Sequence, residues 1–276
     1  MKKPKVLQNR PIGVFDSGLG GLTVVKQLLK YLPNEKIVYF GDTARVPYGT
    51  KSKDAVRRFS VQNAEFLLKF KVKMIVVACN TSSSLALPIL KRKFAVPIMG
   101  VVEPGAEKAV QMTKTQKIAI IATPATISSD VYQKHIKKTA VKNVICFSKS
   151  CPLFVPIVEE GLADSEIALK AAKMYLKHFN KLGIDTLILG CTHYPILKNT
   201  IKKVLKKDIM LVDSAKEVAL AVKELLKEFN LLNRQRNTKE KKRLCCFVSD
   251  APGNFQKIAE VFLHRKMNGA IKVVKS

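Results

Sequence analysis

The sequence predicts an α/β fold made of two pseudo-symmetric, doubly wound domains with mostly parallel sheets. Apolar, strand-like runs alternate with amphipathic helical stretches along the chain, which is the pattern of repeated strand–helix units. The runs are continuously apolar, as expected when helices cover both faces of a sheet. The order of motifs in the first hundred residues also returns in the next hundred. Together these three observations predict the fold class.

Nine apolar runs are predicted to be strands. In chain order they cover residues 11–16, 36–42, 72–78, 96–102, 117–123, 141–147, 185–190, 207–213 and 243–249. Amphipathic stretches between them, such as 164–182, are predicted to be helices because their apolar residues recur at helical spacing. A further helix is expected from about Ser214, and the charged residues 233–243 are expected to form an exposed loop.

A weak internal repeat divides the chain into two halves. The stretches "KMIVVACNTSSSLALPIL" and "TLILGCTHYPILKNTI" both contain a strand, a cysteine, hydroxyl-bearing residues and a helix, with Cys79 and Cys191 112 residues apart. We therefore expect a first α/β domain formed by residues 1–100 plus 213–276, and a second formed by residues 101–212. The helix from Ser214 is expected to return to the first half.

The composition is that of a globular protein, with 276 residues, 47% hydrophobic and 25% charged. No apolar stretch approaches the ~20 residues that a membrane helix needs, and the early apolar run that ends at Asp16 is too short for a signal peptide. We expect a cytoplasmic protein without a membrane partner. The six cysteines show no C-x-x-C spacing, so neither a disulfide framework nor a zinc site is predicted.

The net charge is strongly positive, with 49 Lys and Arg against 21 Asp and Glu and a formal value of +28. The lysines are spread along predicted helix faces and are not gathered with aromatic residues. No zinc-finger, RRM or KH signature is present. We therefore expect a solvated basic surface and no specific nucleic-acid partner, although such a field would attract an anionic substrate.

Polar residues follow several of the predicted strands. In open α/β sheets, ligands bind beyond the carboxyl ends of the strands. The clusters at these ends are Asp16-Ser17, Asp42-Thr43, Cys79-Asn80-Thr81, Thr123 and Cys191-Thr192-His193. If the two halves face each other, the two thiols enter one cleft from opposite sides. We place the active site in this cleft.

Each of the two cysteines stands between a strand and a helix start. Unpaired backbone N–H groups and the helix dipole at such a position are expected to lower the thiol pKa from ~8.5 toward neutrality. Two inert, buried cysteines are the alternative, but their equivalent places in the repeat favour a function. Inversion of a carbon centre needs a base on one face and an acid on the other. One thiolate could remove a Cα proton while the opposing thiol delivers a proton.

Five motifs resemble those of the glutamate racemase family, whose enzymes work without pyridoxal phosphate and supply D-glutamate for peptidoglycan: "GVFDSGLGGLTV", "YFGDTARVPYG", "ACNTSS", "PLFVPIVEEG" and "LGCTHYPIL". The resemblance runs from about Ile12 to about Leu263. It implies that the protein binds glutamate as its small-molecule partner and racemises it, with no organic cofactor and no metal. We also expect a homodimer.

The resemblance also assigns residues to roles. Cys79 and Cys191 match the catalytic acid/bases; Asp16 matches a residue that assists the first, and Glu159 and His193 match residues that assist the second. The positions that match substrate contacts are Asp16, Ser17, Tyr48, Gly49, Asn80, Thr81, Thr126, Thr192 and His193. Two departures concern packing or loop shape: "FVSDAPGNF" replaces a Ser/Thr-Gly-Asp pattern, and Ser82 to Ser84 replace smaller apolar residues.

Other interpretations stay open at this point. From the residues alone, His193 could cap the next helix, Glu159 could be a surface residue and Asp16 could hold the glycine turn. A racemase of aspartate or another acidic amino acid would share the paired cysteines. A cysteine hydrolase using Cys191 and His193 leaves Cys79 without a role. A pyridoxal-phosphate enzyme lacks a lysine in a cofactor setting, and a non-catalytic amino-acid-binding module would tolerate loss of either thiol.

Overall fold

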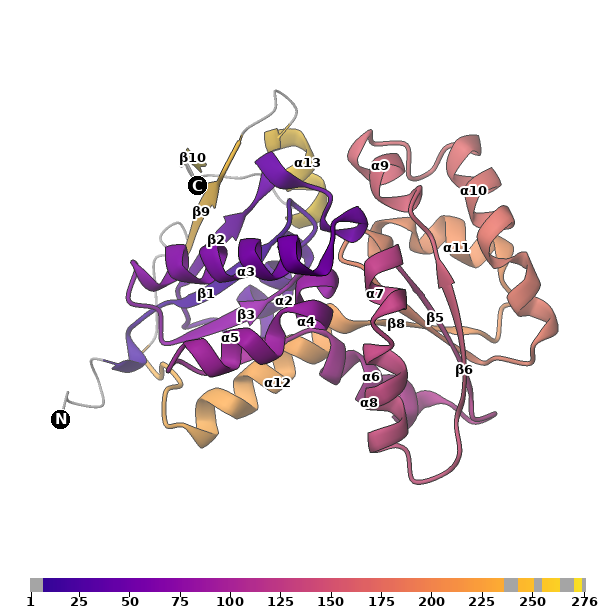
Figure 1. The fold of residues 1–276 in the computed structure, drawn as a ribbon, viewed down its shortest axis with the longest axis horizontal. Helices are drawn as coiled ribbons and strands as arrows, with labels where there is room; N and C mark the ends of the chain where they lie inside the picture. The colour runs from indigo at the N-terminus through magenta and orange to yellow at the C-terminus, as the bar shows by residue number, and fades with distance from the viewer. Residues whose placement is uncertain (1–6, 236–242, 251–254, 264–270, 275–276) are drawn as a thin grey trace.

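The computed structural model describes residues 7–235, 243–250, 255–263 and 271–274 (Figure 1). It contains two sheets of parallel strands, which confirms the predicted fold class. The first sheet has the order β10-β9-β2-β1-β3-β4, formed by β1 (Ile12–Asp16), β2 (Ile37–Gly41), β3 (Met74–Val77), β4 (Ile98–Gly100), β9 (Leu244–Val248) and β10 (Lys272–Val273). The second has the order β6-β5-β7-β8, formed by β5 (Lys117–Ala122), β6 (Ile145–Ser150), β7 (Thr186–Gly190) and β8 (Met210–Asp213).

The two sheets share one topology. The order β2-β1-β3-β4 of the first sheet recurs as β6-β5-β7-β8 in the second, so β3 and β7 occupy equivalent positions. These are the strands that precede Cys79 and Cys191. All nine predicted strands are present. The short strand β10 was not predicted, because its two residues are exposed and carry no apolar pattern.

Helices lie on both faces of each sheet (Figure 1). Their bounds are α2 (Leu22–Tyr31), α3 (Lys53–Leu68), α4 (Asn80–Leu85), α5 (Leu87–Lys93), α6 (Val102–Met112), α7 (Pro124–Ser128), α8 (Val131–Thr139), α9 (Phe154–Glu159), α10 (Glu166–Leu176), α11 (Lys198–Val204), α12 (Ser214–Glu228) and α13 (Phe255–Leu263). In the part of the chain that the structure describes, four short 3₁₀ segments accompany them: η1 (Thr43–Arg45), η2 (Tyr48–Thr50), η3 (Lys177–Lys181) and η4 (Tyr194–Leu197).

Alternate residues of the central strands pack in different hydrophobic clusters. In β1, Val14 packs in the cluster that includes residues of α2, α12 and α13, whereas Phe15 packs with residues of α3 and α5. Both side chains are fully buried, and each such burial contributes about 1.5–3 kcal/mol. In the second sheet, Ile120 packs against residues of α6 and α8, and Ile121 faces the cluster of α9, α10 and α11. Burial on both faces explains the continuously apolar strands.

Helix α12 starts at Ser214, as predicted, and packs against α2 of the first half and α6 of the second. The Asp213 side chain caps it by accepting a hydrogen bond from the Ala215 N–H at 3.0 Å. Among the described residues, none of the helices is both long and apolar enough to cross a membrane.

The prediction of an exposed loop at residues 233–243 is wrong at both ends of this range. Asn233 and Arg243 are buried, because the Asn233 N–H donates to the Glu35 carboxylate at 2.8 Å and Arg243 donates to the Leu29 carbonyl at 2.9 Å. The high charge of this stretch predicted exposure to solvent, but residues of α2 and of the turn after it form hydrogen bonds with Asn233 and Arg243. Residues 236–242 of this prediction lie outside the described residues.

Candidate active site

Cys79 and Cys191 line one cavity between the two halves. Cys79 follows β3 and is the N-cap of α4, with its sulfur accepting a hydrogen bond from the Ser82 N–H at 3.4 Å. Cys191 follows β7 and precedes η4. The cavity volume is about 20 Å³, which is room for about one water molecule. An amino acid can therefore bind only if this cavity widens.

The Cys79 thiol has a raised pKa. Burial and the neighbouring Asp16 carboxylate raise the pKa of Cys79 to about 11, and the hydrogen bonds that Cys79 makes with Ser82 and Ser17 offset only part of this effect. The prediction that the helix start lowers this pKa is therefore wrong. Desolvation of the thiolate, which raises the pKa, outweighs the effect of the helix start, which lowers it. The reason is that the sulfur is almost completely buried, whereas the helix that it caps has only six residues. Cys79 is a thiol at neutral pH.

Asp16 is completely buried at the end of β1. Its Oδ2 accepts hydrogen bonds from the N–H groups of Gly21 at 2.9 Å and Gly18 at 3.3 Å. Its Oδ1 has no hydrogen-bond partner in the part of the chain that the structure describes. Burial raises the pKa of Asp16 in spite of the opposing effects of His193 and these N–H groups. Asp16 therefore both holds the glycine turn and places a carboxyl group beside Cys79.

Cys191 has a different environment, built by His193 and Glu159. The His193 ring connects the two: Nδ1 lies 3.8 Å from the Cys191 sulfur, and Nε2 lies 3.0 Å from the Glu159 carboxylate. Burial alone would lower the pKa of His193, but the hydrogen bonds to Cys191 and Glu159 raise it to about 10. The His193 ring thus stays protonated at neutral pH, and its Nδ1 lies beside the Cys191 sulfur. The two thiols therefore lie in different environments.

Hydroxyl and amide groups connect the two halves at the cavity. The Thr81 hydroxyl lies 3.0 Å from that of Thr123 and 3.4 Å from that of Thr126. From α8, the Tyr132 hydroxyl donates to Asn80 Oδ1 at 2.7 Å. With its oxygen occupied, the Asn80 side chain offers its NH₂ group as a donor to a bound ligand.

The loop after β2 brings Tyr48 and Gly49 to the cavity. The buried Tyr48 hydroxyl donates to Asp42 and accepts a hydrogen bond from Asn63 at 3.1 Å. A Cβ atom at position 49 would lie 2.5 Å from the Thr123 Cβ. Glycine at this position therefore allows η2 of the first half to contact α7 of the second.

Nine of the predicted site residues line the cavity: Ser17, Tyr48, Gly49, Cys79, Asn80, Thr81, Cys191, Thr192 and His193. The other three predicted residues lie behind the cavity lining. Asp16 accepts a hydrogen bond from Gly21 in the glycine turn, Glu159 contacts His193, and Thr126 contacts Thr81. The lining also includes four residues that were not assigned a role: Val46, Pro47, Thr123 and Val155. Thr123 had a signal in its place at a strand end, and Val46, Pro47 and Val155 lie inside the motifs "YFGDTARVPYG" and "PLFVPIVEEG". Among the described residues, no group of acidic, histidine or cysteine side chains could hold a metal ion.

The fold and the site define the class: two α/β halves with equivalent strand orders each present one thiol to a shared cavity, an arrangement suited to proton transfer on two faces of a substrate. Comparison with known proteins agrees with this class. The model of the Asp/Glu/Hydantoin racemase family matches residues 12–222. The chain belongs to this family.

Full-length relatives narrow the comparison. The chain is 46% identical over 264 residues to a glutamate racemase of Geobacter metallireducens, covering 96% of each protein. A glutamate racemase of Francisella tularensis, solved with D-glutamate, is 42% identical with a TM-score of 0.88, covering 97% of this chain and 98% of that chain. One of Thermus thermophilus, solved with beta-chloro-D-alanine, is 45% identical with a TM-score of 0.85, covering 99% and 98%.

Proposed function

We propose that this protein interconverts L- and D-glutamate with its two thiols and so supplies D-glutamate for peptidoglycan. The observation that carries the proposal is the placement of Cys79 and Cys191 on one cavity, from equivalent strand ends of two halves. The full-length similarity to glutamate racemases supports glutamate as the substrate. Cytoplasmic action as a homodimer is part of this proposal.

In the proposed reaction, each thiol serves one enantiomer. With L-glutamate, the Cys191 thiolate removes the Cα proton, and the electron pair of the broken C–H bond stays on the substrate as a carbanion. The Cys79 thiol then donates its proton to the opposite face, which gives D-glutamate and leaves a Cys79 thiolate and a Cys191 thiol. The reverse reaction exchanges these roles. No cofactor is required, because the two sulfurs supply the base and the acid.

The environments of the two thiols match the resting state that this mechanism needs. A protonated His193 beside the Cys191 sulfur suits a base at that position, and the pKa of Cys79, raised to about 11 by burial and Asp16, keeps that thiol protonated. Glu159 holds the His193 ring through Nε2. The free enzyme is thus poised to accept L-glutamate. The NH₂ group of Asn80 and the Thr81 hydroxyl are suited to hold a substrate carboxylate.

Chiral analysis after incubation of the purified protein with L-glutamate tests the proposal. D-glutamate should form, and parallel incubations with L-aspartate and diaminopimelate should separate the glutamate enzyme from racemases of other acidic amino acids. Cys79→Ala and Cys191→Ala should each lose at least about 10²–10⁴-fold in rate. Cys146→Ala is the matched control, because Cys146 lies in β6 outside the cavity lining. Absence of D-glutamate, or a Cys79→Ala variant as fast as wild type, would contradict the proposal.

A further inference from the structure

Asp42 is a completely buried acid that follows β2 directly and has no role in the reaction described so far. It precedes residues 43–50, which contain η1 and η2 and which we call the Tyr48 loop. This loop supplies four consecutive residues of the catalytic cavity lining: Val46, Pro47, Tyr48 and Gly49. The position of the loop therefore sets the shape of one wall of the cavity.

Both oxygens of the Asp42 carboxylate accept hydrogen bonds. The Tyr48 hydroxyl donates to Oδ2, and Arg45 Nε lies 2.7 Å from the same oxygen. The Ser249 hydroxyl, directly after β9, donates to Oδ1 at 2.9 Å and accepts a hydrogen bond from the Ala44 N–H at 2.9 Å. One buried carboxylate thus connects the start of the Tyr48 loop, its later part and the end of β9.

The Tyr48 side chain is held at both its hydroxyl and its ring. The hydroxyl donates to Asp42 and accepts a hydrogen bond from Asn63 Nδ2 at 3.1 Å. The ring packs in a buried cluster with Val56 and Cys79. A phenol has one proton to donate, so while it is bonded to Asp42 the hydroxyl offers no donor to a substrate. Tyr48 therefore serves the cavity through its position.

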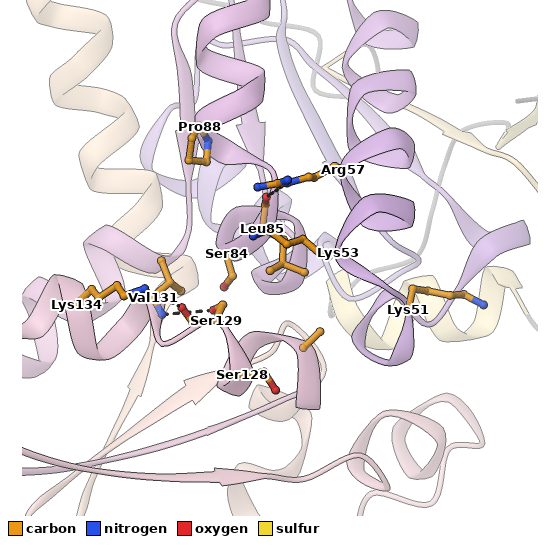
Figure 2. Close-up of a pocket in the computed structure, with 11 residues that line it drawn as sticks. Lys51, Lys53, Arg57, Ser84, Leu85, Pro88, Ser128, Ser129, Val131 and Lys134 are labelled. Atoms are coloured by element: carbon orange, nitrogen blue, oxygen red, sulfur yellow. Dashed lines mark hydrogen bonds between the residues drawn. The ribbon is translucent and has the colours of Figure 1, made fainter.

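The Tyr48 loop is fixed to the same part of the first half as the Cys79 thiol. Asn63, which donates to Tyr48, stands on α3. This helix is bonded to α4, because Arg57 Nε donates to the Leu85 carbonyl at 3.1 Å, as Figure 2 shows in the close-up of a neighbouring pocket. Cys79 is the N-cap of α4. The hydrogen bonds of the Tyr48 hydroxyl thus set the place of the loop relative to this thiol.

We propose that Asp42 is a positioning residue for glutamate binding and acts through the Tyr48 loop. Asp42 does not line the cavity itself. A Cβ atom at Gly49 would lie 2.5 Å from the Thr123 Cβ, so a displaced loop also alters the contact between the two halves. The loop carries neither thiol and none of the groups that assist them. Its displacement therefore weakens glutamate binding more than it slows proton transfer, a consequence that rests on the proposed function.

Asp42→Asn tests the proposal at constant side-chain size. Because both carboxylate oxygens accept hydrogen bonds, the amide NH₂ group must replace one acceptor, and the charge opposite Arg45 is lost. KM for glutamate should rise at least about tenfold, the loss expected for hydrogen bonds to a charged group. The change in kcat should be much smaller, which is the sign of lost binding. An unchanged KM, or an equal loss in kcat, would overturn the proposal.

The matched control is Glu35→Gln, at the other end of the same strand. Glu35 is a buried carboxylate just before β2, with its Oε2 2.5 Å from Lys73 Nζ, and it does not line the cavity. This variant should lower the free energy of unfolding and leave KM unchanged. A similar rise of KM in Glu35→Gln and Asp42→Asn would mean that any buried carboxylate of the first half has this effect, and the specific role of Asp42 would be lost.

Tyr48→Phe tests the same connection and serves if Asp42→Asn does not fold. This variant keeps the ring and removes only the hydroxyl that donates to Asp42. KM should rise in Tyr48→Phe, and the double variant should have a KM close to that of Asp42→Asn alone, because both substitutions break the same bond. A double variant in which the two effects multiply, or a Tyr48→Phe enzyme with the wild-type KM, would show that Asp42 does not act through Tyr48.

Hydrogen exchange separates the role of Asp42 from the proposed function, because it needs no turnover. The amides of residues 43–50 should exchange faster in Asp42→Asn than in the wild type, and at the wild-type rate in Glu35→Gln. Unchanged exchange in the Tyr48 loop of Asp42→Asn would overturn the positioning role even in an active racemase. A wild-type protein that forms no D-glutamate would contradict the proposed function, whereas the exchange of the loop would still test its attachment to Asp42.

Discussion

Gly20→Ala is a single-atom test of how the two halves meet at the site. A Cβ atom at position 20 would lie 2.7 Å from His193 Nδ1 and still closer to the Thr192 hydroxyl. The backbone of Gly20 is not left-handed, so alanine is compatible with it, and the conflict is purely with the opposite half. Relief of the overlap must move His193 away from Cys191 or separate the halves.

The expected loss can be estimated from this geometry. Overpacking of this kind costs about 1–3 kcal/mol, and displacement of a catalytic group by ~1 Å lowers the rate by about 10²-fold. We expect kcat/KM for glutamate to fall by about two orders of magnitude. The assay is chiral analysis of initial rates, with thermal unfolding to show that the variant is folded.

The matched control is Gly13→Ala, whose Cβ would meet Val72 and Leu67 at 3.1 and 3.2 Å inside the first half. This control should lower the free energy of unfolding and leave kcat/KM nearly unchanged. A Gly20→Ala enzyme with the wild-type kcat/KM would refute the reasoning, because it would mean that the glycine turn does not contact the Cys191 motif in the active enzyme.

Two further predictions concern the groups around the thiols. The form that accepts L-glutamate needs protons on Cys79 and His193, whose pKa values are about 11 and about 10, so kcat/KM should fall only above about pH 10. Asp16→Asn removes a negative charge that favours both protons, and this variant should move the fall in kcat/KM to lower pH. An unchanged pH profile would contradict the proposed coupling between Asp16 and these two groups. Tyr132→Phe leaves the Asn80 oxygen without its donor, and the loss of a buried hydrogen-bond partner costs ~1–3 kcal/mol. KM should therefore rise about tenfold with a smaller change in kcat. An unchanged KM would show that Tyr132 does not orient Asn80.

The meeting of the two cysteines could be predicted from the sequence because it depends on rules of topology. Continuous apolar runs indicate parallel strands, and the residues that come directly after parallel strands lie at one edge of the sheet. The repeat places Cys79 and Cys191 at equivalent edges of two sheets. In the structure Cys79 follows β3 and Cys191 follows β7, which occupy equivalent positions in the two sheets, and both residues line one cavity.

The electrostatics of the site could not be predicted in this way. The sequence indicates that a helix starts at Cys79, but it does not show how completely tertiary packing removes water from the sulfur. Asp16, which also raises the pKa of this thiol, comes from a different strand. Val46 and Val155 line the cavity. They lie inside the quoted motifs, but their apolar side chains do not distinguish them from core residues. Tyr132 contacts Asn80 from the other half, a pairing that depends on how the halves are oriented.

The two-thiol mechanism is tested most directly by the early appearance of deuterium in D₂O. Starting from L-glutamate, the Cys191 thiolate takes the substrate proton and the Cys79 thiol, already exchanged with solvent, delivers deuterium to the other face. The mechanism predicts that at early times D-glutamate carries deuterium at Cα while the remaining L-glutamate does not, and that the pattern is mirrored when D-glutamate is the substrate. Equal labelling of substrate and product from the first time points would contradict it, because a single base would then serve both faces.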